Sequence, residues 1–226
     1  MASPARRLAT LPVLLALALQ APPSPAQAPA TPAQRPYFAP VIVGGMTFPV
    51  ARSGWRSVIE FQDDWHDPRF RLIDGRWQLV GFHEGVDIVA EEGTPVLSAS
   101  AGTVERTGWT FYSGTRVGVR GDDGRYYFYA HLSRIQPGIE PGRRVETGAR
   151  LGDVGNTGYG PPGRTDEFPP HLHFGILADD WINPFPLVSE WYRRAAAVTQ
   201  RAERSLEELT GPARRRVVDS LYGEAA

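Results

Sequence analysis

The chain has 226 residues but no cysteine, no lysine and no apolar run long enough to cross a membrane. Without cysteine there is no disulfide framework, so the fold has to rely on its own hydrophobic core. The absence of cysteine also excludes a lipid-anchored lipoprotein, because that modification needs a cysteine directly after the signal sequence. The apolar run near the N-terminus, Leu8 to Leu19, has twelve residues, whereas a membrane span needs about 20.

The charges are nearly balanced, with 24 basic and 25 acidic residues and a formal net charge of -1. All 24 basic residues are arginine. Because the chain lacks the strong positive charge that nucleic-acid binding requires, we expect no nucleic-acid partner. The 42% of hydrophobic and 22% of charged residues are typical of a globular enzyme.

The first 28 residues have the three parts of a secretory signal peptide. Arg6 and Arg7 give a positive start, Leu8 to Leu19 supplies the apolar segment, and Ala26-Gln27-Ala28 offers a small-x-small cleavage site. An uncleaved anchor is the alternative, and the shortness of the apolar segment disfavours it. We therefore expect an exported protein, periplasmic or extracellular and associated with the cell wall, without a membrane span after cleavage.

Residues 29–40 are rich in proline, alanine and glutamine and show no apolar periodicity, which is typical of a disordered linker. From residue 41 to residue 186, short apolar runs alternate with turn signals, in a chain that has 24 glycines and 21 prolines. This pattern predicts a mainly β domain of antiparallel strands, with the histidines near strand ends.

Beyond Pro186 the pattern changes to helical spacing. Apolar residues recur at steps of three and four, as in an amphipathic helix, at Val188, Trp191, Ala195, Val198, Ala202, Leu206 and Leu209. Residues 187–226 are therefore predicted to be a helical extension whose apolar stripe packs on the β domain. The arginines of this extension are interpreted as a solvated helix face, with binding of an anionic polymer as the alternative.

Four of the five histidines fall in three short motifs. These are Gly81-Phe82-His83-Glu84-Gly85-Val86-Asp87, Tyr129-Ala130-His131-Leu132-Ser133 and Pro170-His171-Leu172-His173-Phe174. Histidine is the commonest metal ligand, and its pKa lies close to neutral pH. Together with Asp87, the motifs indicate a metal site.

The spacing of His83 and Asp87 requires the chain to turn between them. A straight strand separates residues four apart by about 13 Å, whereas each ligand of a zinc ion lies about 2.0–2.2 Å from the metal. Gly85 supplies the freedom for a bend. A helix would also align the two residues, as in the H-E-x-x-H zinc peptidases, but the β-branched run Val86 to Val89 favours a strand. Glu84 is therefore not interpreted as a general base.

The three motifs, in this order, closely resemble those of the lysostaphin-type (LytM-type) zinc metallopeptidases, which cut the peptide part of peptidoglycan. Four further segments stand where members of that family carry similar ones, namely Phe48-Pro49-Val50, Gly93-Thr94-Pro95-Val96, Gly155-Asn156-Thr157-Gly158 and Ile182-Asn183-Pro184. The resemblance covers roughly residues 45–186. It implies the LytM-type fold, a duplicated hybrid motif with two antiparallel sheets and a zinc groove.

The resemblance also implies roles for the motif residues. His83, Asp87 and His173 match the ligands of one zinc ion, and His131 and His171 match the catalytic pair. Two histidines and one carboxylate leave one position of a tetrahedral zinc open, as in a catalytic site. Which of the catalytic pair accepts a proton and which donates one stays open, and no other cofactor is expected.

Two parts of the sequence depart from the family. The segment 159–169 is an insertion before the third motif, interpreted either as a wall of the substrate groove or as a tolerated surface loop. Trp77 lies near the place where some members carry a tyrosine that helps to hold the transition state, and its side chain has no hydroxyl.

His66 lies outside the motifs, between acidic neighbours. A solvated histidine is the preferred interpretation, and a second metal site is the alternative.

The implied function is a zinc-dependent endopeptidase that hydrolyses peptide cross-links or stem peptides of peptidoglycan, in cell-wall remodelling or lysis. The expected partner is a peptidoglycan peptide, a protein regulator stays open, and we expect a monomer. The alternative is a LytM-type adaptor that activates a cell-wall amidase without hydrolysing the wall. Such adaptors lack metal ligands, whereas His83, Asp87 and His173 are all present.

A carrier protein is a third hypothesis, because Gly142-x-x-Val145-x-x-Gly148 is similar to the hairpins of biotinyl and lipoyl domains. Those domains need a lysine to modify, and the chain has none. Phosphohistidine carriers with a related β fold work in the cytoplasm, so the expected signal peptide argues against them.

Overall fold

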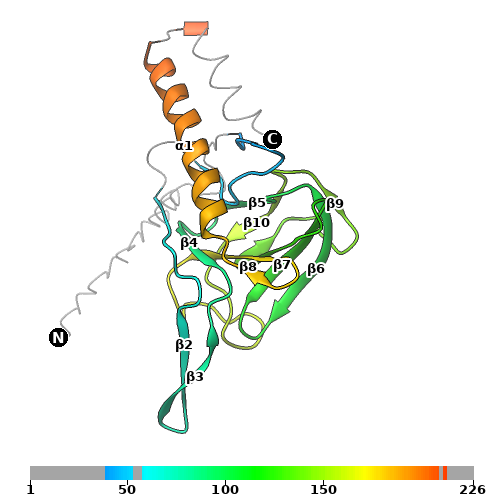
Figure 1. Cartoon of the computed structure of the whole chain (residues 1–226), viewed down its shortest axis with the longest axis vertical. Helices are drawn as coiled ribbons and strands as arrows, with labels where there is room; N and C mark the ends of the chain where they lie inside the picture. Colours follow the sequence, from blue (N-terminus) through cyan, green and yellow to red (C-terminus); the bar gives the residue numbers. More distant parts are fainter. Residues whose placement is uncertain (1–38, 53–57, 209–210, 213–226) are drawn as a thin grey trace, which may run out of the picture.

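The computed structural model describes residues 39–52, 58–208 and 211–212 (Figure 1). The expected signal peptide, most of the expected linker and the last part of the C-terminal extension lie outside the described residues. Within the described part of the chain, no helix is both long and apolar enough to cross a membrane.

Within the described residues, ten strands form one antiparallel sheet, and two more form a separate hairpin. The main path of the large sheet runs β1-β4-β11-β8-β7-β6-β9, while β10 pairs with β5 and β8, and β12 pairs with β11. The strands of this sheet are β1 (Ile59–Glu60), β4 (Val86–Ala90), β5 (Pro95–Leu97), β6 (Gly102–Thr110), β7 (Gly114–Gly121), β8 (Tyr126–Ile135), β9 (Arg144–Val145), β10 (Arg150–Val154), β11 (His171–Leu177) and β12 (Trp181–Ile182). The predicted mainly β, antiparallel fold is confirmed.

The register of three neighbouring strands brings the histidine motifs together. Strand β11 lies between β4 and β8, so His173 is opposite Asp87 on one side and Ala130 on the other. His131 directly follows Ala130 in the chain. Residues that are far apart in the sequence therefore meet at one place on the sheet.

Alternation along the strands separates the core from the site. On β11, Leu172, Phe174 and Ile176 are fully buried in the hydrophobic core. Because successive side chains of a strand point to opposite faces, His171 and His173 lie on the other face. The apolar residues of this strand thus hold the histidines in place from behind.

Helix α1 (Phe185–Glu208) packs on the β domain through one stripe. Its buried apolar residues are Val188, Trp191 and Ala195. The helix begins where the side chain of Asn183 accepts a hydrogen bond from the backbone N–H of Phe185, at 2.9 Å. These contacts confirm the predicted C-terminal helix and its packing.

The predicted stripe is wrong at Val198, which is 48% exposed. Thr199 takes the inward position instead, and it is 3% exposed. A helix turns by about 100° per residue, so the step of four from Ala195 reaches Thr199 and leaves its neighbour outside. The Thr199 hydroxyl donates to the backbone oxygen of Ala195 at 3.1 Å, which allows this polar side chain to be buried.

The hairpin of β2 (Pro68–Ile73) and β3 (Arg76–Phe82) projects from the body of the molecule (Figure 1). Its turn is Asp74-Gly75, with φ of 50° and 73° at the two residues. An Asp-Gly pair with positive φ at both residues is the type I′ turn of tight hairpins. This hairpin was not predicted from the sequence, although its Asp-Gly signal is present.

Candidate active site

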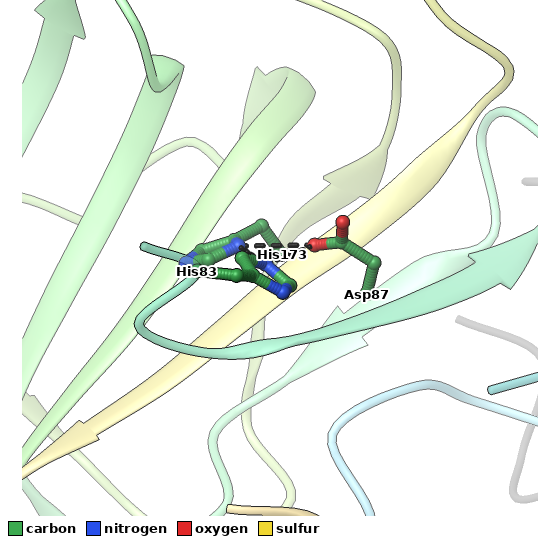
Figure 2. Close-up of side chains that lie close together, drawn as sticks. All are labelled: His83, Asp87 and His173. Atoms are coloured by element: carbon green, nitrogen blue, oxygen red, sulfur yellow. Dashed lines mark hydrogen bonds and ion pairs between the residues drawn. The ribbon is translucent and has the colours of Figure 1, made fainter. Parts of the chain in front are cut away.

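The side chains of His83, Asp87 and His173 converge at one point (Figure 2). Nε2 of His83 lies 2.9 Å from Nδ1 of His173, and each of these nitrogens lies 3.0 Å from Oδ1 of Asp87. His83 is buried, and the other two side chains are half-buried. These are the three residues that were predicted from the sequence to lie together.

This arrangement fits a single metal ion. Ligand atoms about 2.0–2.1 Å from a tetrahedral zinc lie about 3.3 Å from one another. The three atoms are already 2.9–3.0 Å apart, so a small outward shift would place them around one ion. Two imidazole nitrogens and a carboxylate oxygen are also donors that zinc accepts.

The turn that joins His83 to Asp87 lies between two strands, because β3 ends at Phe82 and β4 begins at Val86. A Cβ atom on Gly85 would lie 2.5 Å from Cε1 of His173. Glycine is therefore needed here so that the imidazole of His173 can approach the backbone closely. Glycine at position 85 therefore has two reasons, namely the bend that was expected from the sequence and this close approach of His173.

The remaining ring nitrogen of His83 is held by Asp64. Nδ1 of His83 lies 3.0 Å from the backbone oxygen of Asp64, so Nδ1 carries the hydrogen and donates it. In the neutral imidazole, the form that binds a metal, Nε2 then has its lone pair toward Asp87 and His173. A hydrogen bond on the far nitrogen is the usual way in which a metal-binding histidine is oriented.

The electrostatics of the cluster depend on the burial of its charges. Burial alone would lower the pKa of His83, but the carboxylates of Asp64 and Asp87 outweigh it and raise this pKa to about 9. Burial would raise the pKa of Asp87, but hydrogen bonds from His173 and His83 hold it far below its usual range. Burial keeps the pKa of His173 below its usual value. Asp87 is thus an ionised carboxylate, which can bind a cation.

The second oxygen of Asp87 has its own partner. A terminal nitrogen of Arg69, on β2, lies 3.2 Å from Oδ2 of Asp87. This ion pair turns Oδ1 toward the two histidines. Sequence reasoning missed Arg69 and the role of Asp64, because both reach the cluster from loops or strands whose position the motifs do not predict.

His131 and His171 lie beside the cluster with their ring centroids 4.8 Å apart. Nδ1 of His131 donates to the backbone oxygen of Thr157 at 2.7 Å, and Nδ1 of His171 donates to that of Pro169 at 2.9 Å. Each ring therefore keeps the lone pair of Nε2 free for proton transfer. Nε2 of His171 lies 3.7 Å from Oδ1 of Asp87.

The backbone of His131 is in the left-handed region, with φ of 61°. This conformation costs free energy for a residue other than glycine and is common at functional sites. Thr157 helps to hold it, since its hydroxyl donates to the backbone oxygen of Leu132 at 2.9 Å. Burial, helped by His173 and His171, lowers the pKa of His131 to about 3. His131 is therefore neutral near pH 7.

A groove of about 510 Å³ opens over these side chains. Its walls are aromatic and include Tyr112, Phe128, Tyr159, Phe168 and Trp181. Tyr159 and Phe168 come from the insertion, and the ring of Phe168 lies 4.6 Å from that of His131, edge to face. The insertion therefore forms part of the groove wall.

Three other residues considered in the sequence lie outside the three-residue cluster. Trp77 is 72% exposed on β3, and the phenol groups of the groove come from Tyr112 and Tyr159. Glu84 lines the groove outside the three-residue cluster. His66 stacks on Trp65 at 4.4 Å and, among the residues that the structure describes, belongs to no group of three potential metal ligands.

Comparison with known proteins places the site in a family. The model of Peptidase family M23 matches residues 81–184. The chain is 40% identical over 143 residues to an L-Ala–D-Glu endopeptidase of Bacillus subtilis (strain 168). The aligned residues cover 61% of this chain and 42% of that protein. It is 36% identical over 105 residues to the glycyl-glycine endopeptidase ALE-1 of Staphylococcus capitis, covering 46% of this chain and 26% of that one.

Among solved structures, lytM from Ruminococcus gnavus ATCC 29149 matches with a TM-score of 0.51 and 30% identity, covering 69% of this chain and 61% of that chain. Of the two endopeptidases, from Bacillus subtilis and Staphylococcus capitis, the chain spans less than half the length. The matched segment contains all five residues of the two histidine sites. Residues 81–184, slightly less than half of the chain, match Peptidase family M23.

Proposed function

We propose that the chain is a zinc-dependent endopeptidase that hydrolyses peptide bonds of peptidoglycan. The observation that carries the proposal is the cluster of His83, Asp87 and His173, whose three ligand atoms lie 2.9–3.0 Å apart beside a second pair of histidines. The two curated relatives support the substrate class, since both are named as endopeptidases. His83, Asp87 and His173 would hold one zinc ion.

A zinc ion bound there supplies Lewis-acid chemistry, which polarises the scissile carbonyl group and activates water. His131 and His171 move the protons. Both line the groove with Nε2 unprotonated, so one of them can accept the proton of the attacking water on Nε2 and this proton can then be passed to the leaving amine. Once protonated, that Nε2–H group can also stabilise the negative charge that develops on the carbonyl oxygen.

The aromatic walls of the groove orient the substrate. Phe128 and Trp181 line the groove with their ring centroids 6.1 Å apart, and Tyr159 and Phe168 of the insertion line it with theirs 5.6 Å apart. Apolar rings exclude water and strengthen the electrostatic interactions between the histidines and the substrate. We propose that the insertion shapes the groove, in preference to the alternative of a tolerated surface loop.

Export is part of the proposal, because peptidoglycan lies outside the cytoplasm. The signal-like segment 1–28 supports a periplasmic or cell-wall location. The bond that is cut stays open, since the two curated relatives are named for different bonds, L-Ala–D-Glu and glycyl-glycine.

The test is digestion of purified peptidoglycan by the zinc-loaded chain, with and without a chelator, followed by mass spectrometry of the released fragments. New peptide ends that disappear with the chelator would establish the endopeptidase and identify the bond. If zinc is bound and no bond is cut, the proposal is wrong and the adaptor function gains support.

A further inference from the structure

A second pocket, of about 380 Å³, lies next to the groove on the same face of the sheet. Three residues, Ser113, Phe128 and Trp181, line both the pocket and the groove. The pocket is therefore an extension of the groove, and a ligand that occupies one can continue into the other.

The register shows why the two lie on one face. Phe128 is opposite Gly118 of β7 and Gly175 of β11, and side chains of directly opposite residues point to the same face. Neither glycine has a side chain to fill this face. A Cβ on Gly118 would lie 1.8 Å from the hydroxyl of Tyr126, and one on Gly175 would lie 2.8 Å from the ring of Trp181.

Three arginines line the pocket, but they are not equivalent. Arg120 is neutralised by Glu105, with 3.0 Å between its terminal nitrogen and the carboxylate. Arg106 and Arg116 have no salt bridge to any carboxylate of the described residues. Nε of Arg116 is also buried, with no hydrogen-bond partner among the described residues. An unpaired buried N–H costs free energy, so this atom gains from a ligand that accepts its hydrogen bond.

We propose that this pocket binds a carboxylate group of the substrate peptide, with Arg116 and Arg106 as its donors. The inference rests on the proposed function. Carboxylates are the anionic groups of a peptide, and guanidinium groups bind them with strong, charge-assisted hydrogen bonds. Phe128, Tyr126 and Trp181 supply apolar contacts beside the charge.

The position of the pocket also defines where the carboxylate lies on the substrate. Strand β8 separates β11 from β7, so the backbone at Arg116 lies two strand spacings, about 10 Å, from that at His173. An extended peptide covers this distance in about three residues. The acidic residue recognised here is therefore near the scissile bond but separate from it.

The experiment compares two peptidoglycan stem peptides, one with free carboxylates and one with the same carboxylates amidated. Binding is measured by calorimetry and hydrolysis by chromatography, for the full chain and for Arg116→Gln and Arg106→Gln. Arg125→Gln is the matched control, because Arg125 precedes β8 but does not line the pocket. We expect the unmodified chain to bind the acidic peptide about tenfold more tightly than the amide, the Arg116 variant to lose this preference, and the control to keep it.

The outcomes separate the two proposals. If the chain hydrolyses both peptides equally well and binds them with equal affinity, the carboxylate pocket is wrong while the proposed function stands. If binding depends on the carboxylate and on Arg116 but no peptide is cut, the pocket stands and the proposed function is wrong. Binding of an anionic polymer through Arg116 without any preference between the peptides would also overturn the inference.

Discussion

Nε2 of His83 and Nδ1 of His173 lie 2.9 Å apart, although the two residues are separated by 90 positions in the chain. Both nitrogens also face the same oxygen of Asp87. Two imidazole lone pairs at this distance repel each other unless a proton or a cation lies between them. Without metal, a proton on His83, whose pKa is raised to about 9, prevents this repulsion, and a metal ion can take the place of the proton.

Removal of metal is thus predicted to destabilise the chain. A ligand that binds only the folded state at a concentration 100 times its Kd stabilises it by about 2.7 kcal/mol. We expect the Tm of the zinc-loaded chain to fall by several degrees when a chelator is added, as measured by calorimetry. An unchanged Tm would show that the folded state gains nothing from the metal.

The substitution Gly85→Ala tests the close approach of His173. Its Cβ would lie 2.5 Å from the imidazole ring, so the ring has to move out of the cluster. We expect the affinity for zinc to fall at least about tenfold, because displacing one ligand breaks the geometry of the site. The substitution Glu84→Ala, one residue away and exposed, is the control in a zinc titration. Equal affinity of both variants would contradict the role given to Gly85.

The pKa of His131 predicts how stability depends on pH. Burial lowers this pKa from 6.5 to about 3, so between these values the unfolded chain binds more protons than the folded one. The free energy of unfolding therefore decreases as the pH falls through 6.5 toward 3. We expect His131 to account for a few kcal/mol of this loss, since each pKa unit corresponds to about 1.4 kcal/mol.

The measurement is denaturant unfolding of the metal-free chain at several pH values, compared with His131→Asn. Asparagine tolerates the left-handed backbone at this position, so the variant removes the titrating group without adding strain. The variant is expected to lose less stability between pH 6.5 and pH 4 than the unmodified chain. Parallel pH curves for the two proteins would contradict the assignment.

Phe168 is predicted to be the residue through which the insertion affects hydrolysis. Its ring packs edge to face on His131 at 4.6 Å and lines the groove. We expect Phe168→Ala to lower kcat/KM for peptidoglycan about tenfold or more, because His131 loses the contact that orients its ring. Arg164→Ala, an exposed change in the same insertion, should leave kcat/KM unchanged. If both variants behave alike, the insertion is only a surface loop.

Much of the fold was predictable from the sequence, because its signals are local. Alternation of apolar residues, glycine-rich turns and helical spacing beyond Pro186 indicate an antiparallel β domain followed by a helix. The three histidine motifs indicate which side chains meet, and the structure places His83, Asp87 and His173 together. That these residues bind zinc stays a prediction.

The rest depends on contacts that no local pattern encodes. Arg69 reaches Asp87 across 18 positions, through a hairpin whose Asp-Gly turn was overlooked. Arg116 lines the pocket beside the groove only because β7, β8 and β11 lie side by side. The need for glycine at Gly85 comes from the ring of His173, which approaches from another strand. Such relationships follow from the register of the sheet.

The central claim is that His83, Asp87 and His173 hold the metal on which hydrolysis depends. The most direct measurement is the zinc content of His173→Ala, together with its hydrolysis of peptidoglycan. His66→Asn, which removes an exposed histidine outside the cluster, is the matched control. We predict one zinc per chain and hydrolysis in the control, and loss of both in His173→Ala. Full zinc content and full activity in His173→Ala would contradict it.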